Sequence, residues 1–410
     1  MPCKQAWKAR VIDMVRSANR MEVLSLQYFA TLAPVIRELQ AVGVDVIRLD
    51  IGSPDLPPPA PVIEALSKSA VKENHHGYQH HRGTGALRHA WANYYEQYYG
   101  VELDPNREIL PLLGTKEGIF HLTQALINPG EIALIPDPAY LTYSSGTSFA
   151  GGEPYLLPLE EGNDYWPNLD AIPGEIAARA RLMWLNYPNN PSGAVAKDGS
   201  FTAALEFARE YDILICQDAA YSQITYDGYR APSILEIPEA RDYAVEFNTL
   251  SKSYNMAGWR VGVVVGNTQA LEALYVLKSH ADSGHFLPIL DAATEALKTG
   301  NEWITGRNEI YRKRRDLVVE RLKTLGAGFR IPRGAIYLWF QVPAGMASNT
   351  FTESLLKDTG VSLAPGSIFG TRGEGYARLS LCVPEARLHE AMERLISWWL
   401  QNAREGGEDA

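Results

Sequence analysis

The chain is poor in cysteine and has no long apolar run. Its 410 residues include three cysteines, Cys3, Cys216 and Cys382, which lie far apart and form no CxxC pair. This spacing indicates neither a disulfide framework nor a zinc site, so we expect no metal ion and a reducing compartment. No apolar stretch is long enough to cross a membrane, and residues 1–20 lack the apolar centre of a secretory signal. We therefore expect a cytoplasmic protein with no membrane contact.

A basic surface is missing as well. The formal net charge is -10, and the sequence has neither a basic stripe nor a run of like charges. This balance argues against nucleic acid as the main partner. The composition, 46% hydrophobic and 21% charged, is ordinary for a globular protein. A chain of this length predicts two domains, or one large domain with a smaller lobe.

Short apolar runs alternate with helical segments through the middle of the chain. The runs cover residues 109–113, 132–135, 181–185, 213–216 and 243–247. Short continuous runs of this kind predict a buried, mostly parallel sheet with helices on both faces. A polar cluster follows each run directly, at the edge where open α/β sheets bind ligands.

Both ends of the chain predict a second, smaller α+β lobe. Apolar positions at helical spacing occur at residues 6–17, 27–42, 60–71, 86–99, 268–279, 286–298, 301–324 and 384–403, and strands are predicted at 46–49, 334–341 and 376–382. We expect residues 1–50 to form an N-terminal segment and part of the small domain, 51–298 the large domain, and 299–410 the small domain with an interdomain helix at 301–324.

The cluster that follows the fifth run reads N-T-L-S-K-S-Y-N-M-A-G-W-R, from Asn248 to Arg260. Lys252 sits there between two serines. A lysine at the end of a buried strand can form a Schiff base with an aldehyde, because burial keeps part of its amine unprotonated. Thr249, Ser251 and Arg260 could hold an anion beside it. On this stretch alone, a solvated lysine in a surface loop is an equal alternative.

The other clusters complete a set of ligand groups. Gly114-Thr115-Lys116 opens a predicted helix, and its free N–H groups favour a phosphate. Asp218 ends a strand without an evident local partner, so a buried Asp218 needs a cation such as a protonated pyridine nitrogen. Tyr140 could stack on a ring, and Asn190 and Tyr221 could reach a ring hydroxyl. Together these groups match the requirements of pyridoxal 5'-phosphate.

These motifs resemble those of the pyridoxal-phosphate aminotransferases of fold type I, the aspartate aminotransferase superfamily. The matching stretches are N-Y-P-N-N-P-S-G around Asn190, D-A-A-Y at Asp218, S-K-S-Y-N-M-A-G-W-R around Lys252 and A-R-L-S-L around Arg378. The resemblance covers nearly the whole chain. It implies an α/β fold with a large cofactor-binding domain and a small lobe built from both chain ends. It also implies transfer of an amino group between an L-amino acid and a 2-oxo acid.

The resemblance implies a role for each site residue. Lys252 would carry the cofactor and act as general base, Asp218 would bind the pyridine nitrogen, and Tyr140 would stack on the ring. Asn190 and Tyr221 would contact the ring oxygen. The expected phosphate ligands are Gly114, Thr115, Lys116, Thr249, Ser251 and Arg260. Arg378 would bind the substrate α-carboxylate with Gly52 and Asn186. Tyr78 would reach the phosphate of a neighbouring subunit, which implies a homodimer with shared sites.

Within this superfamily the sequence looks most like the LL-diaminopimelate aminotransferases. Shared stretches include G-T-K-E-G-I, L-N-Y-P-N-N-P and K-S-x-x-D-S-G-x-F at Lys278 to Phe286. Gln223 and Leu290 depart from this branch, whose members often have Glu and Gln there. Both were expected to border the substrate. Arg82, Arg230 and Arg387 are candidates for a second substrate carboxylate.

Other interpretations stay open at this point. The same cofactor residues would serve an aminotransferase for alanine, aspartate or aromatic amino acids, or a β-eliminating lyase. A transcriptional regulator is disfavoured because no basic helix-turn-helix pattern precedes Gly52. His75, His76, His80 and His81 crowd one loop, but their spacing matches no metal motif, so a polar loop at a site or interface is the expectation.

Overall fold

The structure is a computed structural model that describes residues 16–402. The helix expected over residues 6–17 lies almost wholly outside the described residues, and so does the C-terminal tail.

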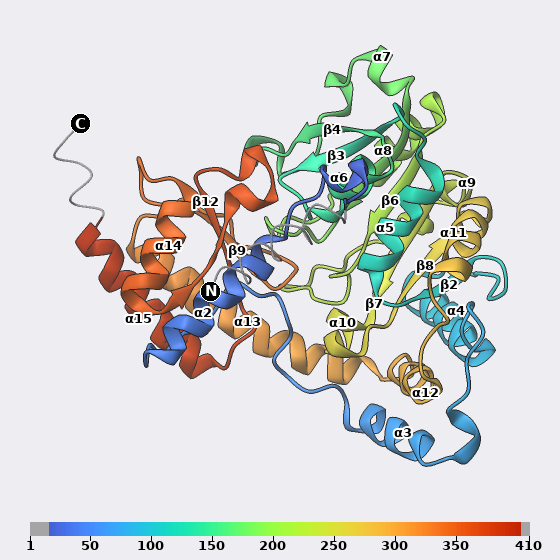
Figure 1. Cartoon of the computed structure of the whole chain (residues 1–410), viewed down its shortest axis with the longest axis horizontal. Helices are drawn as coiled ribbons and strands as arrows, with labels where there is room; N and C mark the ends of the chain where they lie inside the picture. The colour runs from blue at the N-terminus through green and yellow to red at the C-terminus, as the bar shows by residue number, and fades with distance from the viewer. Residues whose placement is uncertain (1–15, 403–410) are drawn as a thin grey trace, which may run out of the picture.

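The secondary structure alternates along the chain between helices and short strands (Figure 1). The helices are α2 (Tyr28–Ala41), α3 (Ala60–Ala70), α4 (Gly85–Tyr99), α5 (Thr115–Leu126), α6 (Thr142–Phe149), α7 (Gly174–Ala177), α8 (Ser200–Tyr211), α9 (Ala240–Tyr243), α10 (Leu250–Ser253), α11 (Thr268–Ala281), α12 (Leu287–Ala296), α13 (Asn301–Thr324), α14 (Ser348–Thr359) and α15 (Glu385–Asn402). The strands are β1 (Ile47–Arg48), β2 (Ile109–Leu112), β3 (Ile132–Asp137), β4 (Glu153–Pro158), β5 (Ala180–Asn186), β6 (Leu214–Asp218), β7 (Ala244–Thr249), β8 (Gly262–Gly266), β9 (Tyr337–Gln341), β10 (Val361–Ser362), β11 (Ala364–Pro365) and β12 (Tyr376–Ser380).

A seven-stranded sheet forms the centre of the larger lobe, in the order β2-β8-β7-β6-β5-β3-β4. Its strands are parallel, except that β8 is antiparallel to both of its neighbours, β2 and β7. The carboxyl ends of β2, β3, β5, β6 and β7 therefore meet at one edge. Because β8 runs the other way, its amino end, which Arg260 precedes, reaches the same edge.

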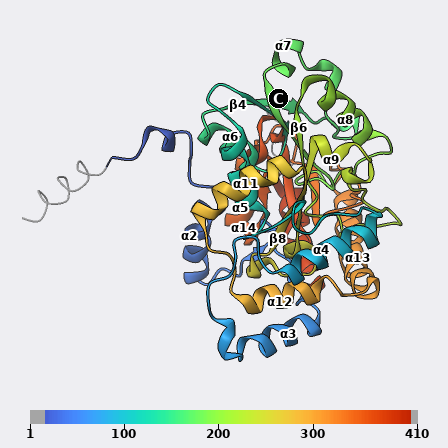
Figure 2. The ribbon, with the colours of Figure 1, turned by 90° about the vertical axis from the view of Figure 1, so that its right-hand side faces the viewer.

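The sheet is buried on both faces because successive side chains of a strand point to opposite sides. Along β5, Leu182 and Trp184 join one core and Met183 and Leu185 join the other. Helices α5 and α11 cover the first face, and α4, α8 and α12 cover the second. Helix α3 lies along α12 (Figure 2).

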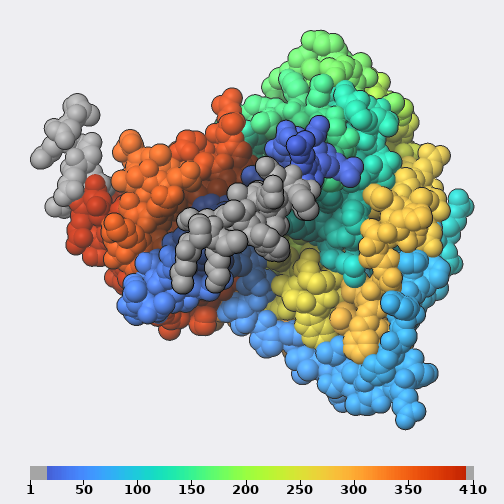
Figure 3. Space-filling model, in the orientation of Figure 1, coloured from blue at the N-terminus to red at the C-terminus, as the bar shows by residue number. Residues whose placement is uncertain are grey.

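The smaller lobe joins the two ends of the chain. Strand β1 pairs in parallel with β10, and β11, β12 and β9 form an antiparallel sheet. A separate core that includes Phe340, Phe351 and Trp398 lies beneath α14 and α15. The long helix α13 runs from α12 into this lobe (Figure 1). In the space-filling view a notch opens between the two lobes (Figure 3).

The predicted class is confirmed: a mostly parallel sheet flanked by helices, with a smaller α+β lobe from both chain ends. The pattern missed β4, an edge strand whose two prolines and exposed side chains hide its strand character. The predicted domain boundaries, after residues 50 and 298, stay predictions. Within residues 16–402, no helix combines the length and apolar character that crossing a membrane requires.

One acidic side chain lies inside the core of the larger lobe. Glu246 of β7 is fully buried and accepts hydrogen bonds from Tyr95 (2.9 Å), the Ser233 hydroxyl (2.8 Å) and the Ile234 N–H (3.1 Å). Burial raises the pKa of Glu246 to about 7, although these donors act to lower it. The folded chain therefore holds this proton more tightly than the unfolded chain does.

Glu246→Gln should change how stability depends on pH. A raised carboxyl pKa gives stability that is complete below the unfolded value, near pH 4, and is lost as the pH rises through about 7. Relative to the variant, the wild type should lose about 3 kcal/mol of unfolding free energy over this interval. Urea unfolding from pH 4 to pH 8 measures the difference. Glu302→Gln, at an exposed position of α13, is the control. A wild-type-to-variant difference that stays constant with pH would show that Glu246 does not titrate in this way.

Candidate functional site

Most of the residues singled out from the sequence line one cavity of about 410 Å³ at the carboxyl edge of the large sheet. They are Gly52, Thr115, Lys116, Tyr140, Asn186, Asn190, Asp218, Tyr221, Thr249, Ser251, Lys252, Arg260 and Arg378. Gly114 directly precedes Thr115, whereas Tyr78 lies elsewhere. Most of these side chains meet because they follow strands that end at this edge, whereas Gly52 and Arg378 come from the smaller lobe.

Lys252 lies on the short helix α10, directly after β7. Its Nζ donates a hydrogen bond to the carbonyl oxygen of Gly52, from the loop that follows β1. Burial lowers the pKa of Lys252 to about 8, and the nearby charges of Arg378 and Arg260 act in the same direction. A substantial part of the amine is therefore neutral near pH 8, as attack on an aldehyde requires.

Asp218 ends β6, the strand beside β7, and also lines the cavity. It accepts hydrogen bonds from the Tyr143 hydroxyl (2.7 Å) and from the Ala220 N–H (3.1 Å). Burial raises the pKa of Asp218 to about 6, although both donors oppose this shift. A cation beside this carboxylate would favour its ionised form. The Tyr143 ring is itself stacked on Trp184, with centroids 4.8 Å apart, so Asp218 has a rigid support.

A positively charged pocket forms where α5 begins. The Arg260 guanidinium packs against Gly114, where an added Cβ would come within 2.3 Å of a guanidinium nitrogen. Lys116 lies nearby, and its Nζ donates to Gln27 Oε1 (2.8 Å). The pKa of Lys116 is lowered by burial and by the charge of Arg260. Two cations and a helix N-terminus at one place form a site for an anion.

Two hydroxyl side chains, those of Thr249 and Ser251, lie beside this pocket. Thr249 caps α10: its Oγ1 accepts from the Ser251 N–H (3.1 Å) and donates to the Val261 carbonyl (3.1 Å). Its one hydroxyl proton is therefore already used within the protein. Ser251 also lines the cavity. The predicted contacts of both hydroxyls with a phosphate stay predictions.

Arg378 lies on β12 of the smaller lobe and reaches across the cavity to the larger one. It donates to Asn190 Oδ1 (2.7 Å) and to the Asp50 carbonyl (2.7 Å). Its guanidinium carbon lies 4.1 Å from the ring centroid of Tyr337 and 4.6 Å from that of Phe369. A buried guanidinium held between aromatic rings suits recognition of a carboxylate.

The remaining predicted side chains also line the cavity. The Asn186 amide joins neighbouring loops, donating to the Asp218 carbonyl (2.7 Å) and accepting from the Asn190 N–H (2.8 Å). The Tyr221 hydroxyl lies 2.8 Å from that of Tyr337. The Tyr140 ring packs edge-on against Tyr143, with centroids 5.8 Å apart.

Several sequence candidates lie away from the cavity. Tyr78 is 93% exposed. Arg82 pairs with Glu272, Arg230 with Glu236 and Arg387 with Asp45 and Glu390. None of these three candidates for the second carboxylate lines the cavity in this protomer. Gln223 and Leu290 do not line it either, and Leu290 is fully buried in the core.

The histidine side chains of the loop at residues 75–81 contact different neighbours. His75 Nδ1 lies 2.7 Å from Ser69 Oγ, and His80 stacks on Tyr275. Within residues 16–402, no group of three or more His, Cys, Asp or Glu side chains could hold a metal ion.

Sequence reasoning missed Tyr143 and Tyr337. Tyr143 lies in the first turn of α6, and its contact with Asp218, 75 residues further along the chain, leaves no local signal in the sequence. Tyr337 occupies the space that Gly52 leaves free: an added Cβ at Gly52 would meet its hydroxyl at 1.8 Å.

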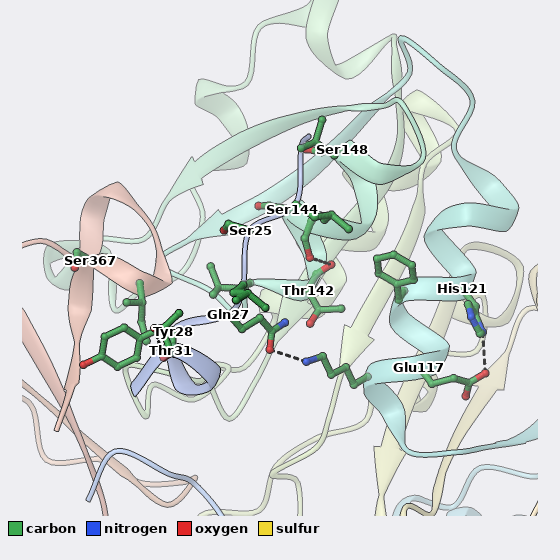
Figure 4. Close-up of a pocket in the computed structure, with 18 of the residues that line it drawn as sticks. Ser25, Gln27, Tyr28, Thr31, Glu117, His121, Thr142, Ser144, Ser148 and Ser367 are labelled. Carbon is green, nitrogen blue, oxygen red and sulfur yellow. Dashed lines mark hydrogen bonds and ion pairs between the residues drawn. The ribbon is translucent and has the colours of Figure 1, made fainter. Parts of the chain in front are cut away.

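A larger cavity of about 970 Å³ adjoins the first, and we call it the antechamber. The two share Gln27, Lys116, Leu141, Arg260 and Ile368. The antechamber lies between the segment around Ser25 and the helices α5 and α6, whose side chains Ser144, Ser148 and His121 line it (Figure 4).

The family model for aminotransferases of class I and II matches residues 44–395. The chain belongs to this family. It is 48% identical to an LL-diaminopimelate aminotransferase from Desulforudis audaxviator, over 92% of this chain and 96% of the relative. It is 45% identical to the enzyme of the same name from Moorella thermoacetica, over 93% and 98%.

Solved structures show the same fold. Apo-BacF from Bacillus subtilis matches with a TM-score of 0.90 and 35% identity, over 94% of this chain and 98% of that one. A probable N-succinyldiaminopimelate aminotransferase from Thermus thermophilus matches with a TM-score of 0.86 and 38% identity, over 90% and 99%. The protein is thus an aminotransferase that depends on pyridoxal phosphate, as the sequence predicted.

The cavity of this aminotransferase fits pyridoxal phosphate. The pocket at Gly114, Lys116 and Arg260 concentrates positive charge, as a phosphate requires. Asp218 is a buried carboxylate suited to a protonated pyridine nitrogen, and Lys252 is a partly neutral amine suited to the aldehyde. The anion pocket, the carboxylate and the amine lie together at one cavity, so they match the phosphate, the ring nitrogen and the aldehyde of the family's cofactor.

Gly114→Ala should weaken cofactor binding. The added Cβ would displace the Arg260 guanidinium, which packs against this glycine at a φ of +83°. Loss of one charged contact should lower the affinity for pyridoxal phosphate about 10- to 100-fold, measured by equilibrium dialysis. Gly130→Ala is a matched control, because Gly130 has a φ of +82° and no atom within 4 Å of the added Cβ. Equal affinity losses in both variants would show that backbone strain, and not Arg260, explains the effect.

Proposed function

We propose that this aminotransferase takes LL-diaminopimelate as amino donor and 2-oxoglutarate as acceptor. The observation that carries the proposal is the 48% and 45% identity to two relatives of that name, each over more than nine-tenths of the chain. The structural likeness to a probable N-succinyldiaminopimelate aminotransferase adds support.

Substrate binding would begin with the α-carboxylate at Arg378. The contacts of this guanidinium with Asn190 and Tyr337 fix its orientation before substrate arrives. Such preorganisation lowers the entropy loss on binding and places the α-carbon near the Lys252 amine.

Lys252 would move the proton of the reaction. Its pKa of about 8 leaves a neutral fraction at working pH, so Nζ can take the proton from the substrate α-carbon and would deliver it to the cofactor carbon that receives the amino group. When bound, pyridoxal phosphate supplies the aldehyde for the amino group and an electron-withdrawing ring. Asp218, held by Tyr143 and the Ala220 N–H, keeps a negative charge where the ring nitrogen would be protonated. Tyr140 and Tyr221 would orient the ring from the cavity wall.

The distal part of the substrate would extend into the antechamber. A diamino dicarboxylic acid carries a second ammonium and a second carboxylate, which need donors and acceptors beyond the first cavity. The antechamber offers the hydroxyls of Ser144 and Ser148 and the amide of Gln27, and it is continuous with the cofactor cavity through shared residues.

The same proposal includes a homodimer with shared sites. Tyr78 is a large aromatic side chain that is almost fully exposed in this protomer. An exposed aromatic of this kind is typical of an interface, and Tyr78 would reach the phosphate pocket of the second copy.

Lys252→Ala should abolish transamination, because no other base replaces its amine at the α-carbon. General acid–base catalysis alone contributes about 10²- to 10⁴-fold, and loss of the bond to the cofactor adds to this. Glutamate formation from 2-oxoglutarate and LL-diaminopimelate measures the rate. Lys298→Ala removes an exposed lysine of a surface ion pair and should keep full activity. Full turnover by Lys252→Ala would refute the assigned role.

The substrate is tested by mixing the cofactor-loaded enzyme with single amino acids and following the loss of cofactor colour. LL-diaminopimelate should react, whereas alanine and aromatic amino acids should react slowly. Ser144→Phe, which fills the antechamber, should lower kcat/KM for LL-diaminopimelate about 10-fold or more and leave slow alanine turnover unchanged. Thr350→Phe, at an exposed site on α14, is the control. Faster reaction with alanine than with LL-diaminopimelate would overturn the proposal.

A further inference from the structure

The helix that carries Lys252 is unusually short and is held from outside. Helix α10 spans Leu250–Ser253, and a single turn leaves its last carbonyls without partners inside the helix. Arg307, on the distant helix α13, supplies the donors. Its Nη1 donates to the carbonyls of Lys252 (2.8 Å) and Ser253, so one guanidinium nitrogen holds the backbone of Lys252 directly.

Arg307 also ties this helix to the chain that follows Asp218. Its Nη2 donates to the Gln223 carbonyl (2.6 Å), and Asn308 supports both partners, accepting from Arg307 and donating to the same carbonyl (3.0 Å). One side chain thus links the Lys252 loop to the loop after β6. Lys252 lies in the first of these segments, and Asp218 directly precedes the second.

The guanidinium of Arg307 carries its charge in a buried environment, which is energetically unfavourable. The residue is 3% exposed, and its acceptors are neutral oxygens. In the described part of the chain it forms no ion pair, whereas its neighbours Arg314 and Arg315 pair with Asp55 and Asp227. Burial lowers the pKa of Arg307 to about 10, so the guanidinium stays charged at neutral pH. A buried cation without an anion is destabilising unless its hydrogen bonds are satisfied.

A second arginine of the same helix holds the substrate side of the cavity. Arg314 follows Arg307 by seven residues, so both lie on nearly the same face, about 10 Å apart along the axis. It forms a two-pronged pair with Asp55 (2.7 and 2.9 Å) and donates to the Leu381 carbonyl (3.0 Å). Asp55 lies three residues after Gly52, and Leu381 directly follows β12, the strand of Arg378.

We propose that Arg307 and Arg314 are positioning residues, and that α13 acts through them as a rigid spacer between Lys252 and Arg378. Arg307 holds the lysine that would move the proton, and Arg314 holds the loop and strand that would bind the substrate carboxylate. The inference rests on the roles proposed above for Lys252 and Arg378. A misplacement of about 1 Å between reacting groups lowers rates about 100-fold. A helix spanning both lobes is suited to prevent it.

The two arginines should affect different kinetic constants. Arg307→Met should lower kcat about 100-fold with little change in the KM for the amino acid, because the lysine is displaced while Arg378 is not. Arg314→Lys keeps the charge but cannot make both hydrogen bonds to Asp55. This variant should mainly raise the KM for the amino acid, about 10-fold. Arg315→Met is the matched control: Arg315 is buried on the same helix and binds Asp227 and the Pro332 carbonyl.

A measurement without turnover separates positioning from stability. Each protein is incubated with pyridoxal phosphate and reduced with borohydride, and the rate at which Lys252 is labelled is read by peptide mass spectrometry. Arg307→Met should be labelled about 10-fold or more slowly than Arg315→Met at equal stability in urea. Arg307→Lys, which keeps the charge and one or two hydrogen bonds, should be intermediate and answers the question if the Met variant does not fold.

The outcomes distinguish the two proposals. Labelling of a lysine other than Lys252 in the wild type would refute the role proposed for Lys252 and, with it, the positioning role that rests on it. The positioning role would be overturned if Lys252 were labelled at equal rates in the Arg307 and Arg315 variants. It would also be overturned if the labelling rate fell only in proportion to the loss of stability in urea.

Discussion

The site depends on the opposite effects that burial has on two side chains of one cavity. Removing water destabilises the charged form of each group, so it lowers the pKa of Lys252 and raises that of Asp218. The lysine thereby becomes a usable base and nucleophile. The aspartate becomes a carboxylate that gains by having a cation beside it. A cofactor that brings both an aldehyde and a basic ring nitrogen satisfies the two requirements together. The neighbouring anion pocket at Gly114 and Arg260 would then fix the end of the cofactor that carries the phosphate.

The topology of the sheet explains why these groups meet. Parallel strands end at a common edge, so the polar residues after β2, β5, β6 and β7 converge without any local signal that they should. The reversed strand β8 brings Arg260 to that edge from its amino end. The smaller lobe contributes Arg378 from a different sheet. A substrate bound between them therefore contacts both lobes, and the relative position of the lobes becomes part of the chemistry.

The sequence predicted the helices and strands better than the side-chain contacts between them. Periodicity located α13 at its observed bounds, because a long amphipathic segment with clear ends leaves little choice. The cofactor residues were accessible because each has a chemical type that suits one part of the ligand. Tyr143, Tyr337 and Arg307 were not accessible, since their roles arise from contacts with residues 75, 116 and 55 positions away in the chain. The three arginines considered for the second carboxylate do not line the cavity, because each is paired with an acidic side chain elsewhere.

The proposed function separates the residues for specificity from those for catalysis. The residues that would hold the cofactor and the α-carboxylate use charge, ring faces and backbone groups that every amino acid substrate presents alike. They cannot distinguish one donor from another. The antechamber is different, because its surface of hydroxyls and amide comes from the segment before α2 and from α6, which do not carry the reacting groups. Under the proposed function, changes at Ser144 and Ser148 would alter what fits beyond the α-carbon, whereas Tyr143 of the same helix holds Asp218. One scaffold can therefore change its substrate while it keeps the same chemistry.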